Sequence, residues 1–417
     1  MKGLRSPLGK SRTSRDASST LVTNALLASS SAVGSVLAAR LLGPEGRGQL
    51  AAAVVWAAVL GVIAGTGMPQ ALTYYAARNR ENRGRIIGNA GIIWVSQSML
   101  ILALGWLVVP VFLGGNRAEL APLVRLYLFS VPLSLFATYT ACIARGFDEY
   151  PLSNTIRASL NVAFPVSLGI AMMLGIHDVY VTLLFMLVSQ AAACAWSALL
   201  FVMKEAPTRV ELHKGQLRAL LSYGIKSYPG SLSWMVNARL DQLLMSTMVS
   251  STTLGLYAVG VTYSTALFPF SSAVATVLFP KVAADQAGAP RRIRRAIKIN
   301  LSVSVLLAAV LAILAPTLLP ILFGPGFRQA TVPAIILLVG TVFLGNNYVL
   351  SDSARGLGRP TIPSIAEGVG AALSVATLIA LLPRFGAIGA AISSAVSYGA
   401  VSIILWVAVR RAALTVS

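Results

Sequence analysis

Charged residues are scarce in this sequence, and acidic residues are the scarcest of them. Only 11% of the 417 residues are charged, with 13 acidic residues against 33 basic ones. Soluble domains usually carry about 25% charged residues. The shortage extends over nearly the whole chain, where 56% of residues are hydrophobic, and this excludes an ordinary soluble enzyme. The composition predicts an all-α polytopic membrane protein.

Cysteine and histidine are also rare, with two residues of each. Cys142 and Cys194 lie far apart in apolar stretches, without the spacing of a disulfide framework or a metal site. His177 and His213 each stand alone, so a zinc or iron centre would lack ligands. We therefore expect no metal and no other cofactor.

Sequence motifs of catalysis are missing as well. The glycine-rich segment 43–48 follows no strand and precedes no Lys-Ser/Thr pair, which argues against a phosphate-binding loop. No nucleophile elbow and no zinc-protease motif occurs, and the outer connections are too short for an external catalytic domain. We therefore expect that the protein is not an enzyme.

Long apolar runs, by contrast, fill most of the chain. About 20 apolar residues span a bilayer as a helix. The sequence predicts twelve such spans: 19–41, 48–76, 86–113, 122–144, 153–175, 179–203, 219–249, 254–280, 293–323, 331–354, 361–382 and 388–409. Basic residues precede the first span as in a secretory signal, but its length and the later spans favour an uncleaved helix.

The basic residues divide unequally between the two sides of these spans. With the N-terminus inside, most of the 33 fall on the cytoplasmic side, and one, Arg239, lies within a span. The outer side receives Arg40, Arg47, Arg117, Arg125, Arg328 and Arg384. This asymmetry predicts that both termini are cytoplasmic and that the basic side contacts anionic membrane lipids. It leaves no basic, aromatic groove for nucleic acid.

Short matches between the two halves indicate an internal repeat. Segments 48–51 (GQLA) and 255–258 (GLYA) match at an offset of 207 residues, and Arg85 and Arg292 share that offset. Each half holds six spans, so a parallel repeat of the kind found in transporters is expected. We predict an N-terminal six-helix lobe at 1–203, a cytoplasmic linker at 204–218 and a C-terminal six-helix lobe at 219–417.

Longer motifs make the pattern more specific. Segment 38–50 reads AARLLGPEGRGQL, and the second half carries YGIKSY at 223–228, RLDQLL at 239–244 and LGLYAV at 254–259. These segments resemble the first loop and the seventh and eighth helices of the bacterial polysaccharide (O-antigen type) flippases. That family belongs to the multidrug/oligosaccharidyl-lipid/polysaccharide exporter superfamily. Phe279-Pro280 and ARG at 354–356 also fit, so the resemblance covers almost the whole chain.

The resemblance implies a transporter that flips lipid-linked (polyprenyl-pyrophosphate) oligosaccharide or polysaccharide repeat units across the bacterial inner membrane by alternating access. The expected partners are this lipid-linked oligosaccharide and anionic membrane lipids; a polysaccharide polymerase or glycosyltransferases remain open as further partners. Two alternatives also stay open. One is a cation-coupled multidrug exporter of the same superfamily, although such exporters use buried carboxylates and the first span has none beyond its inner edge. The other is a non-transporting membrane scaffold homologue.

Polar residues in the seventh span mark the expected binding cavity. At about 100° per residue, Lys226, Asn237 and Asp241 share one helix face, and such groups are costly in a bilayer unless they face a cavity or a partner. A pyrophosphate needs cations, and sugars need amide and hydroxyl partners. The residues expected to bind substrate are Lys226, Asn237, Arg239, Asp241, Gln242, Asn24 and Arg40.

Other interpretations of these polar residues remain open. The stripe on the seventh span is also compatible with helix–helix packing, and snorkelling to the interface is the stronger interpretation for Arg40. Glu367, in the eleventh span, fits a structural ion pair and a role in proton coupling equally well. Tyr74 and Tyr75 are interpreted as residues of the interfacial aromatic belt.

Overall fold

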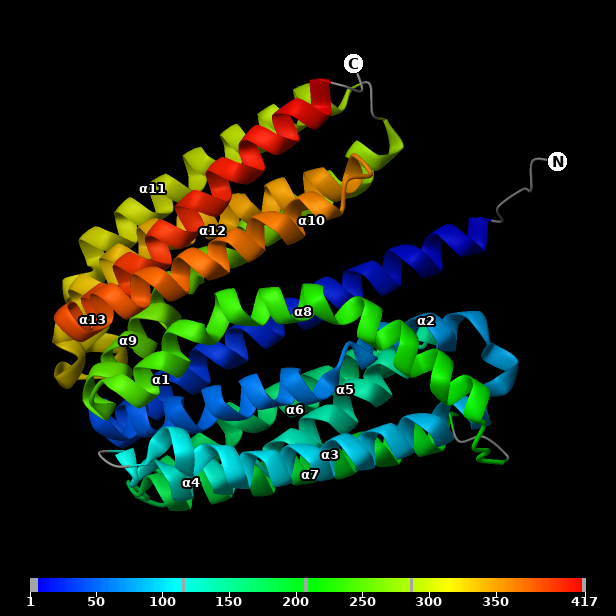
Figure 1. The fold of residues 1–417 in the computed structure, drawn as a ribbon, viewed down its shortest axis with the longest axis horizontal. Helices are drawn as coiled ribbons and strands as arrows, with labels where there is room; N and C mark the ends of the chain where they lie inside the picture. Colours follow the sequence, from blue (N-terminus) through cyan, green and yellow to red (C-terminus); the bar gives the residue numbers. More distant parts are fainter. Residues whose placement is uncertain (1–6, 115–116, 206–208, 286–287, 415–417) are drawn as a thin grey trace. The chain divides into compact units, whose positions relative to one another are not determined.

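The computed structural model of the chain describes residues 7–114, 117–205, 209–285 and 288–414, and within these ranges it is built of helices (Figure 1). The first helices are α1 (Pro7–Gly65), α2 (Met68–Arg78), α3 (Arg83–Leu113), α4 (Leu120–Tyr127), α5 (Ser130–Gly146), α6 (Tyr150–Met173) and α7 (Val179–Glu205). They are followed by α8 (Lys214–Met248), α9 (Ser251–Ser264), α10 (Phe268–Ala284), α11 (Ala289–Phe323), α12 (Thr331–Gly356) and α13 (Thr361–Leu414). The predicted all-α membrane fold is confirmed.

Two of these helices are pairs joined end to end at a glycine. Gly43 (φ 66°) kinks α1 and Gly386 (φ 53°) kinks α13, and both have the left-handed backbone that glycine adopts without steric cost. The kinks fall between predicted spans, 19–41 and 48–76 in α1, and 361–382 and 388–409 in α13. Among the described residues, nine helices are long and apolar enough to cross a membrane, and the kinked pairs count as one each.

The predicted span 254–280 is interrupted in the structure. Helix α9 ends at Ser264, a 3₁₀ turn covers Thr265–Leu267, and α10 begins at Phe268. Pro269 lies in the first turn of α10. Because proline has no backbone N–H and its ring crowds the preceding turn, it starts a new helix instead of continuing α9.

The chain folds into two compact units, which divide it differently from the predicted lobes. Unit 1 comprises Met1–Leu37 and Trp56–Ser231, and unit 2 comprises Ala38–Val55 and Leu232–Ser417. The middle of α1 therefore belongs to unit 2, and the first half of α8 belongs to unit 1. The predicted linker 204–218 lies within unit 1.

Small residues allow the helices of unit 1 to approach closely. A Cβ added to Gly146 at the end of α5 would lie 2.5 Å from the Cβ of Ala76 and 2.8 Å from the carbonyl oxygen of Thr73, both in α2. Inside the unit, Gln97 of α3 accepts a hydrogen bond from Tyr139 of α5 and donates one to Thr66 at 2.8 Å. This network holds the turn between α1 and α2, where Thr66 has a φ of 39°.

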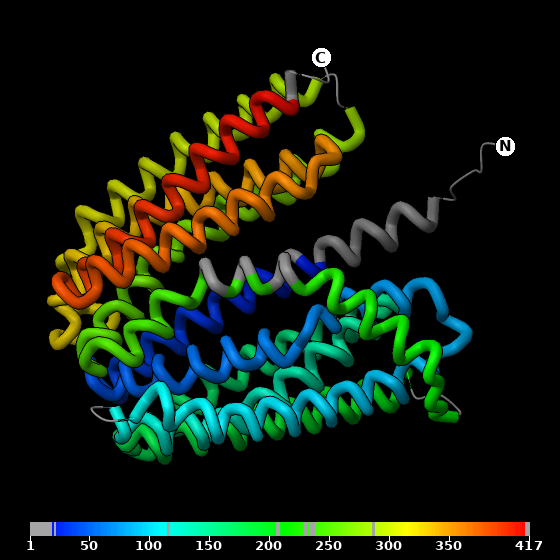
Figure 2. The backbone as a smooth tube through the Cα atoms, in the orientation of Figure 1, coloured from blue at the N-terminus to red at the C-terminus, as the bar shows by residue number. Residues whose placement is uncertain are grey.

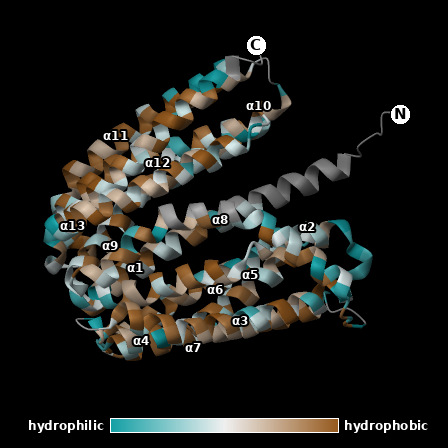
Figure 3. Cartoon of the chain, in the orientation of Figure 1, coloured by the Kyte–Doolittle hydropathy of each residue, from teal (hydrophilic) through white to brown (hydrophobic). Residues whose placement is uncertain are grey.

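The core of unit 2 lies among its last four helices, with α12 beside α10, α11 and α13, as the trace in Figure 2 shows. It contains Ala275, Leu278, Val282, Ile293, Val349, Leu350, Ala354, Val401, Leu405 and Val409. Hydrophobic colour covers most of the length of α3 and α11 in Figure 3, as expected for helices in contact with lipid.

Candidate functional site

The buried carboxylate of Asp241 is the centre of a polar cluster in unit 2. Asp241 lies on α8 and is only 7% exposed. The hydroxyl group of Tyr257, which is fully buried on α9, donates a hydrogen bond to its Oδ2 atom. Ser394 of α13 lies 3.5 Å from the same oxygen, and the backbone N–H of Gln242 donates to Oδ1 at 2.7 Å. Three helices therefore hold this carboxylate in one orientation.

Two arginines of unit 2 lie in or next to this cluster. The guanidinium of Arg239 interacts with Asp241 and also with the guanidinium of Arg47, which is partly buried on α1. Two neighbouring guanidinium groups repel each other, and an anion bound between them would relieve this repulsion.

The backbone of α1 brings Arg47 to this cluster. After the kink at Gly43, α1 packs directly on α9. A Cβ on Gly48 would meet the carbonyl oxygen of Ser251 and lie 2.9 Å from the backbone nitrogen of Gly255. Only glycine at position 48 permits this approach, which places the neighbouring Arg47 inside unit 2.

The structure brings some of the predicted site residues together. Arg239, Asp241 and Gln242 lie in the cluster, although Gln242 contributes its backbone N–H. Glu367 of α13 belongs to the same unit and interacts electrostatically with Tyr398, which in turn interacts with Asp241 and Arg239. Asn237 lies outside the residues whose side chains the structure describes. The functional roles of all these residues remain predictions.

Other predicted site residues lie elsewhere. Arg40 donates through Nε to the carbonyl oxygen of Leu322 at 2.8 Å and through Nη2 to that of Ile321. These are terminal carbonyls of α11, so Arg40 caps the negative end of that helix. Lys226 and Asn24 belong to unit 1, where Lys226 is exposed and Asn24 accepts a hydrogen bond from Arg157 of α6 at 3.0 Å.

Sequence reasoning missed three members of these polar groups. The charge pattern places Arg47 on the outer side, Tyr257 appears only within the LGLYAV motif, and no sequence pattern singles out Arg157. The close spacing of Gly46 and Gly48 around Arg47 was a usable signal, because small residues mark close helix contacts. For Tyr257 the chain offered none, since its partner depends on how α8 and α9 pack.

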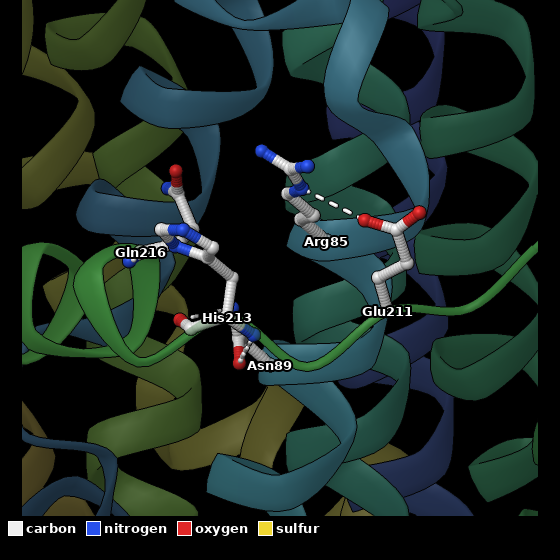
Figure 4. Close-up of polar contacts among 5 residues, drawn as sticks. All are labelled: Arg85, Asn89, Glu211, His213 and Gln216. Atoms are coloured by element: carbon white, nitrogen blue, oxygen red, sulfur yellow. Dashed lines mark hydrogen bonds and ion pairs between the residues drawn. The ribbon is translucent and has the colours of Figure 1, made fainter.

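The segment before α8 is attached firmly to α3 within unit 1 (Figure 4). Asn89 donates to the carbonyl oxygen of His213 at 3.2 Å and accepts from its backbone N–H at 3.3 Å. Arg85 forms an ion pair with Glu211 at 2.9 Å. The ring nitrogen Nδ1 of His213 accepts from the backbone N–H of Gln216 at 3.1 Å and so caps the start of α8. The first half of α8 is thereby fixed to unit 1.

Comparisons with known proteins identify the family to which the chain is similar and the fold that it shares. A family model described as "Polysaccharide biosynthesis protein" matches residues 14–285. An uncharacterized membrane protein of Methanocaldococcus jannaschii is 26% identical over 66% of this chain and 56% of its own length. A probable low-salt glycan biosynthesis flippase of Haloferax volcanii is 23% identical over 43% of this chain and 39% of its own length. The chain thus spans about half the length of the curated relatives it matches.

Solved structures share the fold at low identity. A lipid II flippase in an inward closed conformation superimposes with a TM-score of 0.77 and 15% identity, over 96% of this chain and 89% of the other. A multidrug resistance transporter of the MATE family in the MOP superfamily, in an inward-facing conformation, superimposes with a TM-score of 0.72 and 15% identity. The match covers 93% of this chain and 94% of the other. These similarities show a fold that flippases and drug transporters have in common.

Proposed function

The chain belongs to the family of polysaccharide biosynthesis proteins, and we propose that it flips a lipid-linked (polyprenyl-pyrophosphate) oligosaccharide across the bacterial inner membrane by alternating access. The family assignment, the fold shared with a lipid II flippase and the archaeal relative named as a glycan flippase support this substrate class. The family and the fold are those of transporters rather than of enzymes.

The observation that carries the proposal is the pair of interacting arginines in unit 2, Arg47 and Arg239, of which Arg239 also interacts with Asp241. A diphosphate carries an excess of negative charge that Arg47 and Arg239 can neutralise together. Arginine suits this task, because its planar fork donates two hydrogen bonds to phosphate oxygens. Asp241, held by Tyr257 and Ser394, would keep Arg239 in place between transport cycles.

The direction of transport follows from the distribution of charge in the sequence. The basic side of the spans is the proposed cytoplasmic side, so both termini lie there. An inside-negative potential then favours outward movement of an anion by about 2.3 kcal/mol per charge per 100 mV. This driving force requires no coupled ion, and a coupling role for Glu367 remains a separate hypothesis.

A second candidate function is a cation-coupled multidrug exporter. The buried carboxylate of Asp241 favours it, because α8 opens the second half of the chain and exporters of this superfamily use carboxylates in the first helix of a lobe. The fold shared with a MATE transporter supports it as well. The two functions differ in the charge of the cargo, which makes them separable by experiment.

The experiment uses the full chain in liposomes. A fluorescent polyprenyl-pyrophosphate oligosaccharide is scored for movement between leaflets, and a fluorescent organic cation is scored for export in parallel. We expect the glycolipid to move, and Arg47→Gln and Arg239→Gln each to slow it about tenfold or more. The control is Arg328→Gln, which removes an exposed arginine of the same unit.

The possible outcomes separate the candidate functions. Movement of the organic cation alone, lost in Asp241→Asn, would establish the exporter instead. Glycolipid movement that is unchanged in both arginine variants would remove the cluster from the transport path. A protein that binds the glycolipid tightly and moves neither cargo would be a scaffold.

A further inference from the structure

Three tyrosines of unit 1 form an aromatic cluster between α2 and α8. The rings of Tyr74 on α2 and Tyr223 on α8 are stacked, with centroids 4.7 Å apart and an angle of 14° between the planes. Tyr75 meets Tyr74 edge-on at 5.1 Å and Tyr223 at 6.0 Å. Residues separated by about 150 positions in the chain thus build one aromatic surface. The interpretation of Tyr74 and Tyr75 as residues of the interfacial aromatic belt does not include their contact with Tyr223.

Cations lie beside this aromatic surface. The Nη1 atom of Arg78 donates to the hydroxyl group of Tyr74 at 2.8 Å, and Arg78 itself is exposed. Lys226 follows Tyr223 by three residues on α8, so the two side chains leave the helix on the same side, and Lys226 is also exposed. An anion next to the Tyr74 ring would therefore meet the charge of Arg78, and Lys226 offers a second cation on the Tyr223 side of α8.

The aromatic surface is accessible as well as ordered. Tyr74 remains 37% exposed although Tyr223 covers one face of its ring. Directly after Tyr223, α8 packs against the start of α2, where a Cβ on Gly224 would meet the side chain of Met68 and lie 2.7 Å from the carbonyl oxygen of Thr66. The segment that precedes α8 is attached to α3 through His213 and Asn89. A rigid, partly exposed platform of rings with adjoining cations is well suited to bind a ligand.

We propose that Tyr74, Tyr223, Arg78 and Lys226 form a docking subsite for the first sugar and the diphosphate of the lipid-linked glycan. The inference rests on the proposed function and assigns to unit 1 a contact with the sugar itself. A pyranose ring presents an apolar face of C–H groups, which loses contact with water when it lies on an aromatic ring. The adjoining phosphates would lie against Arg78 and Lys226, on the side that we propose is cytoplasmic.

The test compares the binding of two ligands to the full chain in nanodiscs, one being the polyprenyl-pyrophosphate oligosaccharide and the other polyprenyl pyrophosphate without sugar. We expect Tyr74→Leu and Tyr223→Leu to weaken binding of the sugar-bearing ligand about three- to tenfold and to leave binding of the sugar-free ligand unchanged. Tyr74→Phe keeps the ring and should bind both ligands like the unsubstituted protein. Arg78→Gln should weaken both to a similar degree.

Controls separate this subsite from a structural or membrane-anchoring role. Tyr180→Leu removes an exposed tyrosine of α7 and should change neither affinity. Thermal unfolding in detergent identifies any variant that does not fold. If Tyr74→Leu does not fold, the affinities of Tyr74→Trp, which enlarges the stacking surface, are compared with those of the unsubstituted protein instead. Equal loss of both ligands in Tyr74→Leu, or no loss of either, would overturn the sugar contact.

Further results distinguish a failure of the docking subsite from a failure of the proposed function. If Arg78→Gln changes only the binding of phosphatidylglycerol vesicles, the cluster contacts bulk lipid headgroups and the docking subsite is wrong. If the unsubstituted protein binds neither polyprenyl ligand, the proposed function itself fails, and the subsite fails with it. Glycolipid transport that persists with unaltered affinities in both tyrosine variants would overturn the subsite alone.

Discussion

Gly48 and Gly255 lie in direct backbone contact within unit 2. A Cβ on Gly255 would meet the carbonyl oxygen of Pro44 and lie 3.0 Å from the backbone nitrogen of Gly48. These two residues also align with each other in the predicted internal repeat. Two corresponding positions of the repeat therefore pack against one another, and this contact places Arg47 beside Arg239.

The first prediction concerns this contact. Gly48→Ala should lower the free energy of unfolding by about 1–3 kcal/mol, because the added methyl group meets backbone atoms that cannot move aside. Thermal unfolding in detergent measures the loss. Gly368→Ala is the matched control, since its Cβ would meet nothing within 4 Å and alanine favours the helix. Equal behaviour of the two variants would contradict the close contact.

The second prediction concerns the support of Asp241. Tyr257→Phe removes a hydrogen bond to a buried carboxylate. It should lower the free energy of unfolding by about 1.5–3 kcal/mol and reduce transport. Tyr263→Phe, from the same helix, removes a neutral hydrogen bond to the carbonyl oxygen of Leu311 at 2.6 Å and should cost about 1 kcal/mol. Unfolding midpoints and flipping rates are measured for both variants. A larger loss of stability in Tyr263→Phe than in Tyr257→Phe would contradict the prediction.

The third prediction concerns Asn300, which is fully buried on α11. Neither of its amide atoms has a hydrogen-bond partner within the part of the chain that the structure describes. Asn300→Leu should therefore leave the unfolding midpoint unchanged or stabilise the protein by about 1–2 kcal/mol. Asn346→Leu serves as the comparison, because it breaks a hydrogen bond to Ser402 at 2.8 Å and should destabilise. Marked destabilisation by Asn300→Leu would refute the prediction.

The fourth prediction contrasts two neighbouring ion pairs. Arg83 pairs with Glu205 at 2.6 Å, and the side chain of Glu205 is only 3% exposed, whereas Glu211, the partner of Arg85, is 52% exposed. Arg83→Gln leaves a buried carboxylate without its cation and should lower the free energy of unfolding by about 1–3 kcal/mol. Arg85→Gln should lower it by less than about 1 kcal/mol. Unfolding at low and high salt tests this, and equal costs would reject it.

The sequence is sufficient to predict where the helices lie along the chain, but not which helices pack against one another. The predicted spans 86–113 and 293–323 correspond to α3 (Arg83–Leu113) and α11 (Ala289–Phe323), because hydrophobic length determines where a helix can cross a bilayer. The boundaries of the compact units depend on contacts between distant segments, so the assignment of residues 38–55 to unit 2 could not be predicted from hydropathy.

The candidate site was predicted in part for the same reason. Arg239 and Asp241 were found because charge inside an apolar span is conspicuous in a sequence. Tyr257 cannot be identified in this way, since a tyrosine in an apolar helix is ordinary, and for Arg47 the only signal is the pair of flanking glycines. The charge of Arg40 suggests a binding role in the sequence, whereas the structure shows that Arg40 caps α11.

The exchange of helix segments between the two units has a consequence for how the polypeptide can be divided. Unit 1 needs the first half of α8, and unit 2 needs the middle of α1. A single cut between α7 and α8 would leave an N-terminal fragment carrying residues 38–55 without the surface they cover, and a C-terminal fragment missing that piece of its own interior. The two halves of the chain are thus not separable modules, because each compact unit includes a segment from the other half.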